Sequence, residues 1–161
     1  MGYGMGDAFP ESALVRRTLT LREMDLPPTT ALTKRSLLRW VSLSLGLISQ
    51  KESRSTFLDV FDAFLHFQLT KGKEPNTQEL RDFLKEKYKK SVSEKLIQYH
   101  MGRLVSLHLV ECRKRRYSLN NAPNSERGDL KQSFNHWFGS ALQRSSQNVE
   151  YALDKLEKTY Q

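Results

Sequence analysis

Cysteine is almost absent from this chain, because Cys112 is the single cysteine among 161 residues. A lone cysteine excludes an intramolecular disulfide and any metal site that one chain would build from several cysteines. Long apolar runs are absent too, since no stretch approaches the ~18 consecutive apolar residues of a membrane span. The N-terminus lacks a basic segment followed by an apolar one, so no secretory signal is expected. We therefore expect an intracellular protein without a membrane partner, either cytoplasmic and nucleoid-associated or nuclear.

The motifs of common enzymes are missing as well. The sequence contains no P-loop, no G-x-G-x-x-G turn and no H-E-x-x-H pair. Its histidines are scattered along the chain, at His66, His100, His108 and His136. We expect Cys112 to be an inward-facing core residue, and Asp59 and Asp62 to be surface acids of a helix. No enzymatic activity, metal site or cofactor is therefore expected.

The positive charge is concentrated in the middle of the chain. The formal net charge is +8, from 26 Lys and Arg against 18 Asp and Glu. Residues 71–116 alone hold thirteen basic and six acidic side chains, whereas residues 1–30 hold three and four. A basic excess confined to one segment is the electrostatic footprint of a nucleic-acid-binding surface.

The N-terminal third is predicted to contain an arm and two helices. Residues 1–30 show no sustained helical pattern and begin Gly-rich, so we expect a flexible N-terminal arm. A leading helix is predicted over 33–49, and its apolar stripe is so wide that another element must cover it. A second helix is predicted over 55–70, with Ser55 or Thr56 as its N-cap.

Two further helices follow in close succession. Asn76 and Glu79 fit a capping box, in which each side chain satisfies a backbone amide at the start of the third helix. A second box, Ser91 with Glu94, is predicted to begin the fourth helix, over 92–107. Because only a few residues join these helices, the pair fits a helix-turn-helix geometry.

After the fourth helix the apolar period changes from 3.6 to 2. Within 110–119, alternating apolar residues predict two short strands that form a β-hairpin. The connection from Arg113 to Arg116 contains neither Gly nor Asn, which two-residue hairpin turns prefer. The hairpin is therefore expected to be short, or irregular at its tip.

The C-terminal third is predicted to be a polar linker over 121–128 and a long helix within 129–161. Some thirty residues at 1.5 Å each give a helix of ~45 Å, longer than a small domain needs. Apolar or small residues recur there in alternating steps of four and three, a pattern typical of a coiled-coil seam. The seam comprises Phe138, Leu142, Ser145, Val149, Ala152, Leu156 and Thr159. We expect a homodimer held by five of them, Phe138, Leu142, Val149, Ala152 and Leu156.

This order of elements resembles that of winged helix-turn-helix transcription regulators. The stretch from Met101 to Val110 looks like the end of a recognition helix followed by a leucine-valine pair that opens the wing. MarR-like regulators are similar in their helices before and after this unit, and PadR-like regulators in the long helix after the wing. The hairpin is shorter than in the first group and the leading helix is unusual in the second, so the subfamily stays open.

The resemblance covers about residues 33–160 and implies a mainly α fold with a small β-hairpin wing. It places a winged helix-turn-helix domain over 31–120, including the leading helix, and a long dimerisation helix at the C-terminus. The helix over 92–107 would be the recognition helix.

The expected function is sequence-specific binding of double-stranded DNA by a dimeric transcriptional regulator. A helix fits the major groove, where every base pair presents a distinct pattern of donors and acceptors. The hairpin over 110–119 would contact the backbone or the minor groove. The residues expected to contact DNA are Lys89, Lys90, Ser91, Ser93, Lys95, Gln98, Tyr99, Arg103, Arg113, Lys114, Arg115 and Arg116. Four of them are assigned to base edges: Lys95, Gln98, Tyr99 and Arg103.

Other interpretations of the same sequence stay open. The chain could be a winged-helix module that binds protein or RNA within a larger assembly, or an architectural protein that binds DNA without sequence choice. A small-molecule effector is a further option, because Trp40, Phe61, Phe64 and Trp137 could line a ligand pocket between dimerisation helices and core. Core packing explains these four aromatic residues equally well.

Overall fold

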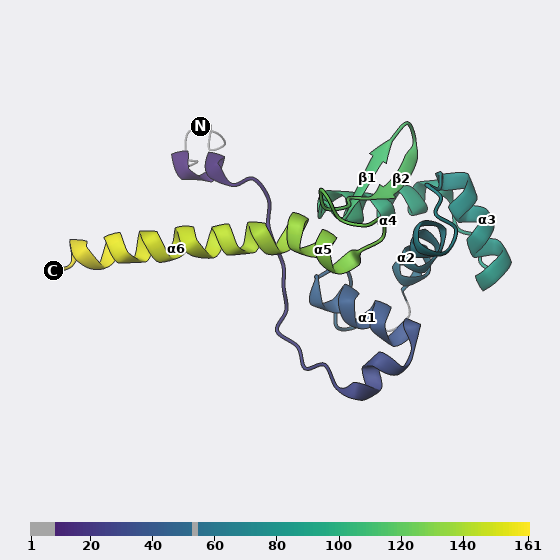
Figure 1. The fold of residues 1–161 in the computed structure, drawn as a ribbon, viewed down its shortest axis with the longest axis horizontal. Coiled ribbons are helices and arrows are strands. Elements are labelled where there is room, and N and C mark those ends of the chain that lie inside the picture. Colours follow the sequence, from purple (N-terminus) through teal and green to yellow (C-terminus); the bar gives the residue numbers. More distant parts are fainter. Residues whose placement is uncertain (1–8, 53–54) are drawn as a thin grey trace, which may run out of the picture.

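The computed structural model describes residues 9–52 and 55–161, which are mainly helical with one two-stranded antiparallel hairpin (Figure 1). The helices between Lys34 and Phe134 and the hairpin gather into one body, and the C-terminal helix extends away from it (Figure 1). None of the described helices is both long and apolar enough to cross a membrane.

Helix α1, Lys34–Ser44, is capped at its N-terminus by the Thr33 side chain and is shorter than the predicted 33–49. It ends early because Gly46 adopts a φ of +69°, a left-handed conformation that suits glycine. Leu47 and Ile48 then leave the helix and enter the core with only 3% and 1% of their surface exposed.

Helix α2, Thr56–Leu65, is the central helix of the body and continues into a π-helical turn, His66–Thr70. The predicted capping by Ser55 is confirmed, since its hydroxyl accepts a hydrogen bond from the Phe57 amide at 3.0 Å. Every residue from Phe57 to Phe64 is buried. A helix buried on all sides has no solvent face on which to place polar residues.

Helices α3, Thr77–Tyr88, and α4, Glu94–Ser106, pack on α2 and on each other. The predicted capping box of α3 is confirmed, with Asn76 and Glu79 each accepting a backbone amide hydrogen bond from the other. The cap of α4 is Ser93 rather than the predicted Ser91, so α4 begins two residues later than expected.

The hairpin consists of β1, Val110–Arg113, and β2, Arg116–Leu119, paired so that Val110 lies opposite Leu119. The Tyr117 amide also donates a hydrogen bond to the carbonyl of Pro75 at 2.9 Å. This bond places the extended segment before α3 beside β2. The prediction for Cys112 is wrong, because its thiol is exposed although Tyr117, the residue opposite it on β2, is buried.

The C-terminal rod consists of α5, Leu130–Phe134, a π-helical turn, Asn135–Gly139, and α6, Ser140–Thr159. The Asp129 side chain caps its N-terminus by accepting a hydrogen bond from the Gln132 amide at 3.1 Å. The rod is buried in the body only up to Ala141, and every residue from Leu142 onward is exposed (Figure 1). The rod therefore projects beyond the domain by most of the length of α6.

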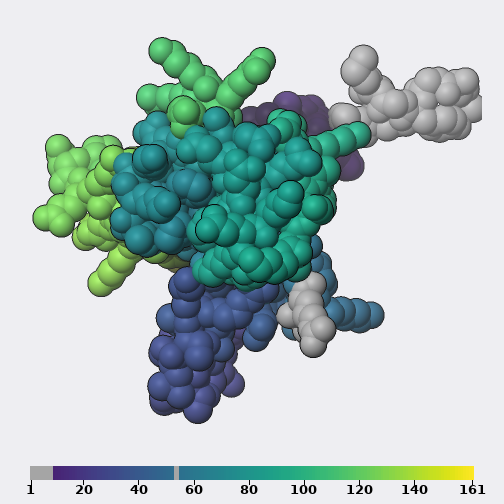
Figure 2. All heavy atoms as spheres, turned by 90° about the vertical axis from the view of Figure 1, so that its right-hand side faces the viewer, coloured from purple at the N-terminus to yellow at the C-terminus, as the bar shows by residue number. Residues whose placement is uncertain are grey.

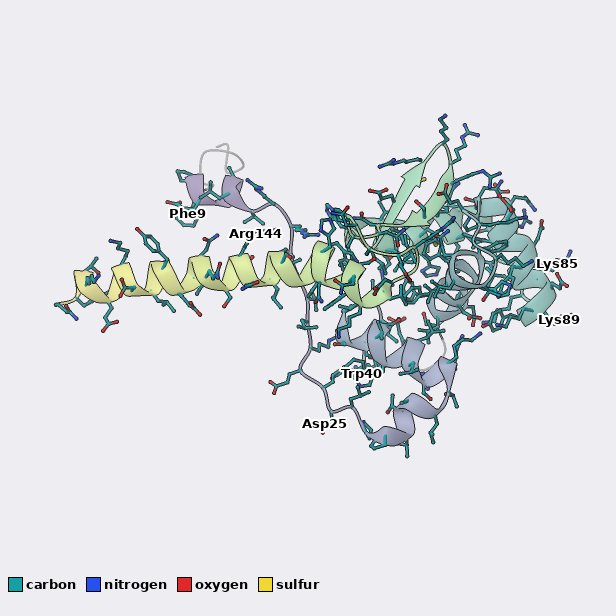
Figure 3. All side chains as sticks on the ribbon, viewed as in Figure 1. Phe9, Asp25, Trp40, Lys85, Lys89 and Arg144 are labelled. Carbon is teal, nitrogen blue, oxygen red and sulfur yellow. The ribbon has the colours of Figure 1, made fainter. Side chains whose placement is uncertain are left out.

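Residues 15–27 form an extended segment, here called the strap, between the short 3₁₀ helices Pro10–Leu14 and Pro28–Leu32. The Arg22 guanidinium donates hydrogen bonds to the carbonyls of Leu43 and Ile48 at 2.8 and 2.9 Å. The Trp40 indole donates to the Asp25 carbonyl at 2.8 Å, on the lower side of the body in Figure 3. The strap is thus fastened to the domain, whereas the described residues before it, 9–14, are exposed; residues 1–8 lie outside the described residues.

Candidate nucleic-acid interface

Helix α4 has one buried face and one face open to solvent. Ile97, Met101 and Leu104 have no exposed surface and fix the helix on the core. On the opposite face Lys95 and Gln98 are exposed, and the Tyr99 ring is 62% exposed. Three of the four residues predicted to reach base edges therefore lie on the solvent side of this helix.

Arg103, the fourth, is drawn toward the domain. Its guanidinium carbon lies 5.2 Å from the centre of the Phe57 ring, a cation–π arrangement, and the side chain is half-buried. Leu96, next to this face, is 40% exposed, while His100 is buried. The contact with Phe57 therefore takes the Arg103 guanidinium off the exposed face of α4.

The turn between α3 and α4 carries basic and hydroxyl side chains, and only some of them are free to contact a ligand. Lys89 is exposed at a φ of +55° and ends α3 in the left-handed conformation. Ser91 is exposed, whereas the Ser93 hydroxyl accepts a hydrogen bond from the Leu96 amide at 3.1 Å. Lys90 is bound to a carboxylate of α2, so the turn offers fewer free cations than its sequence suggests.

Two carboxylates of α2 are the partners of these inward-directed cations. Asp59 and Asp62 are 1% and 2% exposed, so their prediction as surface acids is wrong. Asp59 pairs with Arg35 at 2.7 Å and with Lys90 at 2.5 Å. Because every residue from Phe57 to Phe64 is buried, the acids within this stretch are buried too, and they pair with cations from neighbouring segments.

Asp62 binds the second half of this cluster. Lys87 and Lys34 lie 2.7 and 3.2 Å from its carboxylate, and the Tyr88 hydroxyl donates a hydrogen bond to it. Burial alone would raise the pKa of Asp62, but the hydrogen bonds from Lys87, Tyr88 and Lys34 lower it below its usual value. The pair of acids thus connects α1, α2 and α3 and neutralises basic residues that the charge count had assigned to the surface.

The hairpin tip is the most exposed group of cations next to α4. Lys114 and Arg115 have φ angles of +51° and +64°, the backbone that a two-residue type I′ turn requires. Their strands remain in register up to the pair Arg113–Arg116, so the tip is short and regular. Figure 2 shows long side chains of the hairpin standing out above the face formed by α2 and α3.

The four basic residues of the tip are not equivalent. Arg116 donates hydrogen bonds to the Glu79 carboxylate at 2.9 Å and to the Glu74 carbonyl at 2.8 Å. Arg113 is 80% exposed and lies 3.3 Å from Glu111. Arg116 therefore fastens the hairpin to α3, while Lys114 and Arg115 have no ion pair with any described residue.

The predicted dimerisation residues divide at the edge of the body. Phe138 is fully buried inside the chain, which makes it a core residue rather than a residue of an exposed seam. Leu142, Val149 and Leu156 are 38%, 57% and 52% exposed along α6. The described structure holds one chain, so these apolar side chains face solvent.

The exposed stripe of α6 also differs in phase from the predicted seam. Apolar side chains recur along one side of α6 at Leu142, Val149, Leu153, Leu156 and Tyr160, and Ser146 occupies the remaining position in these steps of four and three. Leu153 is 56% and Tyr160 is 84% exposed, and both were outside the predicted seam. The π-helical turn at Asn135–Gly139 adds a residue to one turn of the rod, so a single seam cannot run from Phe138 into α6.

An apolar cavity of about 550 Å³ lies where α1, α2 and α5 meet. Trp40, Phe61 and Trp137 are among its lining residues, while Phe64 is fully buried elsewhere in the core. Leu37 and Val41 of α1 also line it and are 40% and 36% exposed. The described residues therefore cover the wide apolar stripe of the leading helix only in part.

Comparison with known proteins found no matching family model, no matching curated protein and no matching solved structure. The functional argument therefore depends on the geometry of the described residues.

Proposed function

We propose that this chain is a winged helix-turn-helix protein that binds double-stranded DNA in a sequence-specific way and regulates transcription as a dimer. The packing of α2, α3 and α4 on one another and the hairpin after α4 support this fold. So does the hydrogen bond from Tyr117 to Pro75, because it adds an extended segment to the side of the hairpin.

The observation that carries the proposal is the contrast between paired and unpaired cations. Lys90 and Arg116 are neutralised by Asp59 and Glu79, and thereby hold the helices and the hairpin together. Lys114 and Arg115 stand at a projecting tip without a carboxylate partner among the described residues. Exposed, unpaired cations beside a helix with a polar outer face suit a duplex with phosphates on both sides of its groove.

In this proposal α4 enters the major groove and the hairpin tip contacts the backbone or the minor groove. Gln98 is suited to adenine, because its amide can donate to and accept from the base edge at once. Lys95 and Tyr99 lie on the same exposed face. Arg103 is reassigned to packing on Phe57, and Ser93 to capping α4.

A second copy of the chain is the proposed partner of α6. The stripe from Leu142 to Tyr160 exposes three leucines, a valine and a tyrosine on one side of α6, and a second copy would cover it with an identical stripe. A two-fold dimer would place two copies of α4 about one DNA turn apart, ~34 Å, on a pseudo-palindromic site.

Selection of bound duplexes from a random pool tests the function directly. The expected result is an inverted repeat, with affinity that falls steeply as salt rises. Gln98→Ala should change the preferred base at one position of each half-site, whereas the matched control Gln147→Ala, on exposed α6, should leave the preference unchanged. Salt-dependent binding without any enriched sequence would indicate an architectural DNA-binding protein instead of a sequence-specific regulator. Binding that does not respond to salt would refute the interface.

A protein-interaction module is the second candidate, favoured by the open apolar cavity beside α1 and by the stripe of α6. This candidate predicts that, in a gel-shift assay, the purified chain does not shift any duplex from the same random pool at any salt concentration. Enrichment of a duplex sequence would exclude it.

A further inference from the structure

A second, polar pocket lies at the junction of three parts of the molecule. Its volume is about 320 Å³, and it is distinct from the outer face of α4 and from the hairpin tip. The strap, the root of the hairpin with the end of α4, and the C-terminal rod all contribute to it. Its lining residues are Arg17, His108, Asn120, His136, Trp137, Ser140 and Arg144.

The backbone holds several of these groups in place. Arg17 donates hydrogen bonds to the carbonyls of Trp137, at 2.8 Å, and Leu107, at 3.4 Å, which fixes the strap against the rod. His108 has a φ of +65°, and its carbonyl accepts a hydrogen bond from the Asn120 side chain at 2.9 Å. The pocket is thus assembled from segments that are far apart in sequence.

The chemistry of the lining is that of an anion site. Two arginines and two of the four scattered histidines meet there, and no carboxylate is among the described lining residues. Trp137 lines both this pocket and the apolar cavity, and its buried indole N–H has no hydrogen-bond partner among the described residues. Guanidinium groups bind phosphate and carboxylate through paired N–H donors, and phosphate offers oxygens to several donors at once.

Arg144 is the lining residue best placed to reach a ligand. It lies on the first turns of α6 beside the strap, as Figure 3 shows, and it makes no ion pair with the described residues. On the helical wheel it faces away from the stripe of Leu142 and Leu153, because it lies about 200° from the first of them at ~100° per residue. A ligand held by Arg144 would leave the proposed dimer surface free.

We propose that this pocket binds a phosphate group and thereby clamps the strap to the C-terminal rod. The group can come from a small phosphorylated molecule or from the backbone of a nucleic acid, and the ligand chemistry is the same in both cases. The site goes beyond the proposed DNA contacts of α4 and the hairpin.

Titration of the full chain with pyrophosphate, at constant ionic strength set with sodium chloride, tests the site. Calorimetry should show binding to the wild type that weakens at least about tenfold in Arg144→Gln, the effect of losing a charge-assisted hydrogen bond. His136→Gln should weaken binding in the same direction. Both side chains are exposed, so neither change should affect folding.

Lys155→Gln is the matched control, because it removes the same charge from the same side of α6, eleven residues further along. It should leave pyrophosphate binding unchanged. Absence of binding to the wild type, or equal losses in Arg144→Gln and Lys155→Gln, would overturn the proposal.

A second arm identifies the source of the phosphate. If duplex DNA competes with pyrophosphate and Arg144→Gln weakens duplex binding, the backbone is the ligand. If neither occurs while pyrophosphate still binds, the site takes a small phosphorylated molecule. Because the calorimetric titration contains no nucleic acid, its result does not depend on whether the chain binds DNA.

Discussion

The turn at the hairpin tip allows charge and backbone strain to be tested separately. Lys114 and Arg115 both have positive φ, and the left-handed conformation costs an ordinary L-residue roughly 1–2 kcal/mol. Asn-Gly is the preferred pair for a type I′ turn. The double substitution Lys114→Asn with Arg115→Gly should therefore stabilise the fold. Part of this gain is offset, because glycine increases the conformational entropy of the unfolded chain.

The expected net gain is about 1–2 kcal/mol, which corresponds to a rise of about 3–6 °C in Tm for a chain of this size. In the proposed complex the same double variant would lose two phosphate contacts, so it should bind DNA more weakly. Each contact contributes about 0.9 to the slope of log affinity against log salt, so the slope should fall by about 1.8. Thermal unfolding and fluorescence anisotropy at several salt concentrations measure the two effects.

The control variant Lys114→Gln with Arg115→Gln removes the charges and keeps residues that disfavour positive φ. It should lose the salt-dependent affinity without gaining stability. An unchanged Tm in the Asn-Gly variant would refute the argument from backbone strain. An unchanged salt slope in both variants would show that the tip does not contact DNA.

Two more predictions concern the buried acids and the rod. Asp62→Asn should reduce stability by about 2–3 kcal/mol near neutral pH, because Lys34 and Lys87 lose their buried partner. The pKa of Asp62 is lowered in the folded state, so the stability that its carboxylate contributes should be present above the ordinary Asp pKa of about 4 and lost as the pH falls further. Urea unfolding at several pH values measures this contribution. A free energy of unfolding that depends on pH as strongly in Asp62→Asn as in the wild type would contradict it. Leu153→Glu should raise the dimer dissociation constant at least about tenfold by placing a charge in the apolar stripe, and sedimentation measures it. The control Tyr151→Glu lies on the opposite side of α6 and should leave the dimer intact; equal effects of the two would argue against the stripe.

Features encoded by neighbouring residues were predictable from the sequence. The capping box of Asn76 and Glu79, the cap at Asp129 and the inward positions of Tyr117 and Leu119 all follow from local spacing. The exposed positions of Lys95, Gln98 and Tyr99 followed from helical periodicity.

Features that depend on distant partners were not predictable. Lys90 and Arg116 are held by Asp59 and Glu79, which are 31 and 37 residues away in sequence. A charge count treats such cations as free, and it therefore overestimates the charge available at the interface. The acids of α2 did carry a signal, since a carboxylate surrounded by apolar residues on every side of a helix is rarely buried without a partner.

The π-helical turn at Asn135–Gly139 determines the direction in which the outer half of the rod presents its apolar side. Removing one residue from it would restore regular α-helical winding and rotate everything beyond by about 100°, with an axial shift of only ~1.5 Å. In the proposed dimer, that rotation would change the orientation of the two copies of α4 relative to each other. It would not alter any side chain proposed to contact the partner or the duplex. Deletions and insertions at this site would thus change operator spacing and geometry, leaving base preference as it was.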